Sequence, residues 1–316
     1  MSKRTLHIVD GDSASGTLRQ TALGREGEVL SWRDALYSGP VPEGMSLRQL
    51  SRSRSKFWTA GKSSREFVSR DATLATYGDY EEVVLWFGSD CTLCELSLVQ
   101  LLSWFGEEKR APKRLSWVAE HGGVLNPTQM VQAHSRRRAV TSGHMRIAKV
   151  VWQAFRSATP ARLNRLLSRR LSVPGLKRAI TWVLREYPGK GDGLSRLQRK
   201  LLKEIESREE TRISVAVAAV LSAESVGDSF LFDLLKRCVE VKNPLVKVVR
   251  NGKGHLRYKS QVVLTDLGRG VLRRKADHVQ LNGVDYWIGG VHLVGHEVSW
   301  RWDKAVRRIV SARGGR

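Results

Sequence analysis

The first 120 residues alternate short runs rich in β-branched and aromatic side chains with longer stretches of helical spacing. Strands are expected over residues 6–9, 28–32, 82–87 and 114–119, and helices over residues 17–23, 46–57, 64–76 and 94–105. Strands separated by helix-length segments are typical of βαβ units, in which parallel strands form a sheet that helices cover. Residues 1–122 are therefore predicted to form an α/β domain with a mostly parallel sheet.

The rhythm changes after Asn126-Pro127, where one helical pattern follows another. Helices are expected over residues 127–138, 144–156, 160–169 and 174–187, the last of them stopped by Tyr187-Pro188 and the glycine-rich GKGDG that follows. Proline and glycine at such positions end helices. Residues 123–188 are therefore predicted to be a separate α-helical segment.

Residues 189–316 carry a pattern typical of a winged helix-turn-helix domain. Helices are expected over residues 195–207, 213–221 and 228–239, followed by a hairpin made of LVKVVR and RYKSQVVL around Asn251-Gly252. Three helices with a strand hairpin favour a winged-helix-like C-terminal domain, and the segment LTDLGRGVL supports it as a return helix. The alternative is a helical bundle with an incidental hairpin. The Trp-rich tail is expected to pair WIGGVHL with SWRWD.

Charge is distributed very unevenly along the chain. The net charge is +23, yet residues 1–120 carry 16 basic and 16 acidic side chains, so the whole excess lies in the remainder. No acidic residue occurs between Glu120 and Glu186. A basic surface of this kind points to a polyanionic partner. Nucleic acid is the expected partner, with DNA favoured over RNA because of the winged-helix pattern.

The helix expected over residues 228–239 is poorly suited to reading bases, because Asp228 and Asp233 occupy its early turns and repel phosphates. We therefore expect backbone-dominated, weakly sequence-specific binding by cations of the acid-free helices and of the wing. The expected contact residues are Arg136, Arg137, Arg138, Arg165, Arg169, Arg170, Lys247, Arg250, Lys253, Arg257 and Lys259.

The turn Gly11-Asp12-Ser13 after the first strand has three interpretations. Free N–H groups at the start of a helix bind anions, so the turn is a candidate site for a small anionic ligand. Polar side chains that follow the second and third strands would join it, because parallel strands end at one edge of the sheet. The expected ligand-binding residues are Gly11, Asp12, Ser13, Ser15, Gly16, Thr17, Trp32, Arg33, Asp34, Ser89 and Asp90.

The second interpretation is catalytic. A strand followed by Gly-Asp-Ser resembles the first block of the Gly-Asp-Ser hydrolases, which makes Ser13 a candidate nucleophile, with Asp12 and Asp90 as further catalytic candidates. No Asp-x-x-His stretch follows, so His121 or His134 would have to act as the base. In the third interpretation, Asp12 and Ser13 only cap the helix. Whether the chain is an enzyme is left open.

The chain contains three cysteines, Cys91, Cys94 and Cys238, which are too few for a disulfide framework. Free thiols and a cytoplasmic location are expected, since no apolar run could span a bilayer and no apolar signal region opens the chain. Cys91-x-x-Cys94 lacks the second ligand pair of a zinc site, so no metal is predicted. A thioredoxin-like redox role for this pair is the alternative. Neither a cofactor nor the oligomeric state can be assigned.

Four stretches, LHIVDGDSASGTLRQ, EVLSWRDALYSGPVPEG, VVLWFGSDCTLCELSLVQLLSWF and the tail from LTDLGRGVL to WRWD, resemble the bacterial domain-of-unknown-function family 1835. The resemblance implies an N-terminal α/β domain followed by the family's helical C-terminal half, and it assigns no activity. The chain departs from the family around Gly88-Ser89-Asp90 and Glu95-Leu96-Ser97, where the family usually has other polar residues.

Together these features predict a nucleic-acid-binding protein, a ligand-responsive DNA-binding regulator in its most specific form, whose N-terminal domain holds a small anionic ligand. The alternative is a hydrolase or group-transfer enzyme that acts on a nucleotide or nucleic acid through the Gly-Asp-Ser turn.

Overall fold

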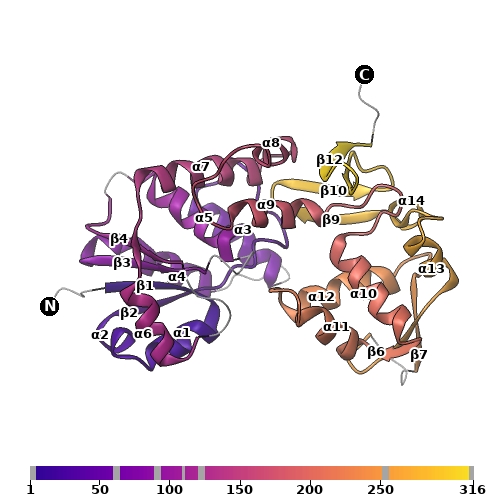
Figure 1. Cartoon of the computed structure of the whole chain (residues 1–316), viewed down its shortest axis with the longest axis horizontal. Coiled ribbons are helices and arrows are strands. Elements are labelled where there is room, and N and C mark those ends of the chain that lie inside the picture. The colour runs from indigo at the N-terminus through magenta and orange to yellow at the C-terminus, as the bar shows by residue number, and fades with distance from the viewer. Residues whose placement is uncertain are drawn as a thin grey trace. The chain divides into compact units, whose positions relative to one another are not determined.

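The computed structural model describes residues 5–59, 65–88, 94–108, 111–119, 125–250 and 256–312, with the side chain of Arg250 excepted. The chain divides into two units (Figure 1). Unit 1 comprises Met1–Thr181 with Gly289–Val291, and unit 2 comprises Trp182–Ile288 with His292–Arg316. The helices between residues 125 and 181 therefore belong to the same unit as the N-terminal sheet.

Unit 1 is built on a five-stranded sheet of order β2-β1-β3-β4-β5. The strands are β1 (Thr5–Asp10), β2 (Glu28–Trp32), β3 (Glu82–Trp86), β4 (Leu115–Val118) and β5 (Arg138–Ala139). The first four are parallel, and only β5 runs antiparallel, against β4. Ile8 of β1 lies opposite both Leu30 and Leu85. The expected α/β region with a mostly parallel sheet is confirmed.

The helices of unit 1 pack around this sheet and on one another (Figure 1). They are α1 (Gly11–Arg19), α2 (Ala22–Glu26), α3 (Leu47–Trp58), α4 (Arg65–Ala75), the 3-10 helix η1 (Tyr77–Asp79), α5 (Cys94–Phe105), α6 (Pro127–Ser135), α7 (Ser142–Arg156), α8 (Ala161–Leu166) and α9 (Leu176–Arg185), the last of which continues into unit 2. Helix α8 packs on α7, and α7 packs on α5. Leu18 of α1 and Met130 of α6 pack on Val9, Trp86 and Val118 of the strands.

Local sequence explains several helix starts. The side chains of Ser46, Asn126, Thr141 and Ser195 each accept a hydrogen bond from the backbone N–H of the residue three positions on, and the side chain of that residue accepts one from the backbone N–H of the cap. Such reciprocal capping satisfies backbone groups that a helix end otherwise leaves unpaired. The helix expected from residue 17 instead begins at Gly11, directly after β1. Likewise, α6 ends at Ser135, because Arg138 and Ala139 pair with the edge of β4.

Unit 2 contains a group of helices with a small antiparallel sheet of order β6-β8-β7. Its elements are α10 (Arg196–Ser207), β6 (Glu210–Arg212), α11 (Ile213–Leu221), α12 (Asp228–Val239), β7 (Val246–Arg250), β8 (Gln261–Leu264), α13 (Asp266–Leu272) and α14 (His278–Asn282). The core between the helices contains Leu201, Val217 and Leu235, all buried. Strand β6 was not expected from the sequence; it is only three residues long.

The C-terminal tail forms two hairpins, not the single strand pair that the sequence suggested. In one, β9 (Val284–Ile288) pairs with β10 (Val291–Gly295); in the other, β11 (Trp300–Asp303) pairs with β12 (Arg308–Ser311). The Gly289-Gly290 pair explains the difference, because a positive φ of 59° at Gly289 allows a tight turn inside WIGGVHL. Among the described helices, none combines the length and apolar character needed to cross a membrane.

Candidate functional site

The carboxyl ends of β1, β2 and β3 meet at one edge of the unit 1 sheet. Strand order β2-β1-β3 places the topological switch between β1 and β3, which is where open α/β sheets usually bind ligands. At this edge, Asp12 Oδ1 accepts a hydrogen bond from Ser31 Oγ at 3.0 Å and lies 2.5 Å from Arg33 Nε. Arg33 also lies 3.0 Å from Glu66 of α4. The structure therefore brings Asp12 and Arg33 together as expected, and adds Ser31 and Glu66.

Asp10 is the residue at this edge that the sequence reasoning missed. It ends β1 and occupies the N-cap position of α1, but its side chain makes no capping hydrogen bond. Burial raises the pKa of Asp10 to about 6. Its Oδ2 lies 2.7 Å from Sγ of Cys94, the first residue of α5. A carboxylate directly after a buried strand was the available sequence signal.

The Gly11-Asp12-Ser13 turn is open but acidic. A Cβ added at Gly11 or Gly16 would meet no atom within 4 Å. The Ser15 and Thr17 hydroxyls do not point toward a ligand, because they donate to the helix carbonyls of Gly11 and Ser13 at 2.6 and 3.1 Å. Of the described charged side chains named at this edge, three are acidic, Asp10, Asp12 and Glu66, and one is basic, Arg33. This charge balance opposes the binding of an anion there.

Two of the expected ligand residues lie in the interior instead. Trp32 is fully buried, and its Nε1 donates to Oε1 of Gln100 in α5 at 3.2 Å. Asp34 forms an ion pair with Arg54 of α3, in which the two side chains are 1% and 0% exposed. Arg54 Nε donates to Asp34 Oδ1 at 2.9 Å. These contacts fix the segment after β2 against α3, so Trp32 and Asp34 stabilise the fold.

The catalytic interpretation requires a base next to Ser13, and no described side chain provides one. Ser13 is exposed in the first turn of α1 and forms no hydrogen bond through its side chain there. His7 and His134 pack instead around Trp86, whose Nε1 donates to His7 Nδ1 at 3.1 Å and whose ring stacks on that of His134. Burial, helped by the neighbouring His134, lowers the pKa of His7 to about 4.

Several expected residues lie outside the described residues. They are Ser89, Asp90, Cys91, His121, Lys253 and the side chain of Arg250. Cys238 is free and buried as expected. Cys94 is disulfide-bonded, so the expectation of a free thiol is wrong there. The small number of cysteines did not exclude a disulfide, because a single bond needs only two of them. Within the described ranges, no group of metal-ligating side chains is large enough to hold an ion.

The cations of the acid-free helices fall into two groups. Occupied cations are held by contacts with other residues, whereas open cations are exposed and form no ion pair with another described residue. Arg137 is occupied: its Nε and Nη2 donate to the two carboxylate oxygens of Glu82 at 2.8 and 3.1 Å. Burial alone would raise the pKa of Glu82, but hydrogen bonds from Arg137 and Ser116 outweigh it and lower that pKa. Arg137 therefore joins the segment after α6 to β3, and its guanidinium is engaged by Glu82.

A second occupied cation is Arg156, which donates to the carbonyl oxygens of Pro42 and Met45 at 2.8 and 2.7 Å. Exposed cations without an ion pair to another described residue follow along α7, α8 and the start of α9. They are Arg146, Arg162, Arg165, Arg169, Arg170 and Lys177. Arg162 and Arg165 are three positions apart and so share one face of α8.

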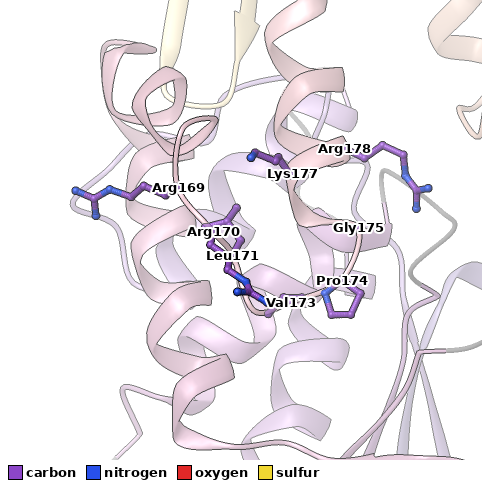
Figure 2. A pocket seen from close by; sticks show the side chains of 8 residues that line it. All are labelled: Arg169, Arg170, Leu171, Val173, Pro174, Gly175, Lys177 and Arg178. Carbon is purple, nitrogen blue, oxygen red and sulfur yellow. The ribbon is translucent and has the colours of Figure 1, made fainter.

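A pocket of about 560 Å³ lies in the loop between α8 and α9 (Figure 2). Its lining includes Arg169, Arg170, Lys177 and Arg178 and no acidic residue. Figure 2 shows Arg169 and Arg178 extending to opposite sides, with Arg170 and Lys177 between them. Gly175, at φ +78°, turns the chain into α9, and its carbonyl accepts the Arg178 and Ala179 N–H groups. Four cations thus line one concave surface.

Unit 2 supplies a second set of exposed cations next to its small sheet. Lys247 lies on β7, and Arg257 and Lys259 precede β8; all three are exposed. The cations of α12 are occupied, since Lys236 pairs with Glu240 at 3.5 Å and Arg237 lies over the ring of Tyr286.

Comparison with known proteins identifies no relative: no family model matches the chain, and no curated protein matches it. The resemblance to domain-of-unknown-function family 1835 therefore stays a prediction.

Proposed function

We propose that this chain binds nucleic acid through phosphate contacts made by Arg162, Arg165, Arg169, Arg170 and Lys177, which we call the α8–α9 basic surface. The observation that carries the proposal is the pocket lined by four cations and no carboxylate. Surface cations of soluble proteins are ordinarily interspersed with acidic side chains that screen them. An acid-free surface of this kind suits a ligand that carries many phosphates.

The arrangement of unit 2 supports the same proposal. Helices α10, α11 and α12 pack on one another and against the sheet β6-β8-β7, and the connection between β7 and β8 is flanked by exposed cations. We interpret this as a winged-helix-like domain whose wing contacts the nucleic-acid backbone, which favours DNA over RNA. With Lys236 and Arg237 of α12 occupied, base reading by that helix lacks support. Binding is therefore expected to be weakly sequence-specific.

Neutralising three cations of the pocket tests the proposal. The variant carries Arg169→Gln, Arg170→Gln and Lys177→Gln, and its affinity for a fluorescent DNA duplex is measured by anisotropy over a range of salt concentrations. Each lost phosphate contact removes about 0.9 from the log–log salt slope, so the slope should fall by up to about three.

The matched control removes the same net charge elsewhere, by Lys113→Gln, Arg208→Gln and Arg269→Gln. These side chains are ion-paired to Glu81, Glu204 and Asp266 and lie outside the pocket. The control should keep the wild-type slope. Equal losses in both variants would mean that only net charge matters, and an unchanged slope in the pocket variant would remove the pocket from the interface.

The hydrolase alternative has less support. It requires a base for Ser13, and the described histidines of unit 1 are engaged elsewhere: His7 and His134 with Trp86, and His144 with the backbone N–H of Thr141. If turnover of a phosphoester or carboxyl ester were found, its survival in both Ser13→Ala and Asp12→Asn would exclude the Gly-Asp-Ser turn as its origin.

A further inference from the structure

A groove of about 600 Å³ lies between α3 and α4, at a place that the sequence did not indicate. Its apolar wall includes Phe67 and Val68 of α4 and Trp104 of α5. Val68 is 60% exposed, so its apolar side chain is accessible to a ligand. A concave site of this volume, mostly apolar with a few polar groups, has the dimensions of a small-molecule site.

Small side chains keep the groove open. Ser51 and Ser55 lie one turn apart on α3 and are 4% and 3% exposed, so they form the floor. Ala72 and Ala75 line it from α4. Leucine at these positions would let the two helices interdigitate, as packed helices normally do. The groove is therefore open because α3 and α4 both carry small side chains along it.

The charge at the groove is positive. Arg48 and Arg52 lie one turn apart on α3, are exposed and line the groove, and neither forms an ion pair with another described residue. The carboxylate in the lining, Asp71, is already neutralised by Arg70, whose Nη2 lies 2.8 Å from Asp71 Oδ1.

Arg70 also supports the floor. Its Nη2 donates to Ser51 Oγ at 2.7 Å, and its guanidinium lies 3.9 Å from the centre of the Trp32 ring. Its Nη1 is buried and has no hydrogen-bond partner within the described chain. The groove therefore combines an apolar wall, a neutralised carboxylate and two open guanidinium groups.

We propose that this groove binds an amphipathic small molecule with an apolar body and one anionic head group, of the chemical class of a medium-chain carboxylate. The apolar body lies along Phe67, Val68 and Trp104, where it removes apolar surface from water. The head group is bound by Arg48 and Arg52, since guanidinium groups form strong, paired hydrogen bonds with carboxylates. This site is independent of the proposed nucleic-acid binding, and it differs from the anion site that the sequence placed at Gly11.

The test uses the full-length chain and the fluorescent probe 8-anilinonaphthalene-1-sulfonate, displaced by unlabelled competitors. Decanoate should displace the probe. Decyltrimethylammonium, which has the same tail and the opposite charge, should compete at least about tenfold more weakly, and acetate should not compete. Equal competition by the two ten-carbon amphiphiles would overturn the role of the arginines, and competition by acetate would overturn the role of the apolar wall.

Variants locate the site. Arg48→Gln with Arg52→Gln should weaken decanoate binding about tenfold, because charge-assisted hydrogen bonds are lost. The control, Lys56→Gln with Arg65→Gln, removes two positive charges as well. These side chains lie on α3 and α4 but outside the groove lining, so the control should change binding less than twofold.

The apolar wall is tested by Val68→Ser, with Val150→Ser of α7 as the matched control, since that valine is also exposed, at 40%. Val68→Ser should weaken decanoate binding about threefold and the control should not. If the Arg48/Arg52 variant and the Lys56/Arg65 variant weaken binding equally, decanoate responds to net charge alone and the proposal fails. If Val68→Ser has no effect, decanoate binds elsewhere. Circular dichroism melting verifies that each variant is folded.

Discussion

At the scale of the single residue, Asp10 shows how position changes the chemistry of a carboxyl group. Its pKa of about 6 lies above the value of about 3.9 for an unfolded aspartate. The folded state therefore holds the proton more tightly, and the stability contributed by protonated Asp10 is complete below about pH 4 and is lost as the pH rises through 6. Asp10→Asn should remove this loss.

We expect Asp10→Asn to raise the free energy of unfolding by about 3 kcal/mol at pH 7.5 and to have little effect at pH 4. Urea unfolding at several pH values measures both. Asp12→Asn, an exposed neighbour in the same turn, is the control and should give no such pH-dependent gain. A gain for Asp10→Asn that is constant with pH would show that burial of its charge is not the cause.

The buried pair of Asp34 and Arg54 gives a second prediction at this scale. Asp34→Ala leaves the guanidinium of Arg54 uncompensated in the interior, since its side chain is 0% exposed. Breaking a buried pair in this way costs about 3–5 kcal/mol. Glu81→Ala removes the partner of exposed Lys113 and should cost far less, because water screens an exposed pair. Comparable losses in the two variants, measured by urea unfolding, would contradict the structural role given to Asp34.

At the scale of the element, substitution by alanine is expected to have opposite effects at two glycines of α13. A Cβ at Gly268 would lie 2.2 Å from the carbonyl oxygen of Leu245, a backbone atom that cannot easily yield, whereas a Cβ at Gly270 would meet nothing within 4 Å. Gly268→Ala should therefore lower the stability by about 1–3 kcal/mol. Gly270→Ala should raise it by up to about 1 kcal/mol, because alanine favours the helix. Thermal melting followed by circular dichroism compares the two, and a loss in both would show that α13 tolerates no side chain on either face.

At the scale of the whole molecule, the charge of +23 predicts how affinity depends on conditions. If binding rests on phosphate contacts, unrelated DNA duplexes should bind with dissociation constants within about threefold of one another. Raising the salt from 50 to 200 mM should weaken all of them about a thousandfold if six contacts form. Anisotropy titrations with three duplexes measure both effects. A strong preference for one duplex would show base reading that neither α12 nor the basic surface explains.

The sequence by itself determined the order and type of most elements. Strand β2 and helices α5, α11 and α12 begin and end at the predicted residues, because their apolar periodicity and end signals are local properties. The imbalance of charge is likewise a property of the chain alone. Local pattern was insufficient at β5 and β6, which are two and three residues long and exist through pairing with strands elsewhere in the chain.

Only the tertiary structure decided which polar side chains are available for function. Arg137 and Arg169 belong to the same acid-free stretch, yet Arg137 is bound by Glu82, 55 residues earlier, whereas Arg169 lines an open pocket. Trp32 and Arg33 are neighbours in sequence, yet one is buried and the other lies at the surface. The groove between α3 and α4 depends on how two helices pack. Partners and exposure arise from contacts between distant segments, and local sequence pattern contains no information about those contacts.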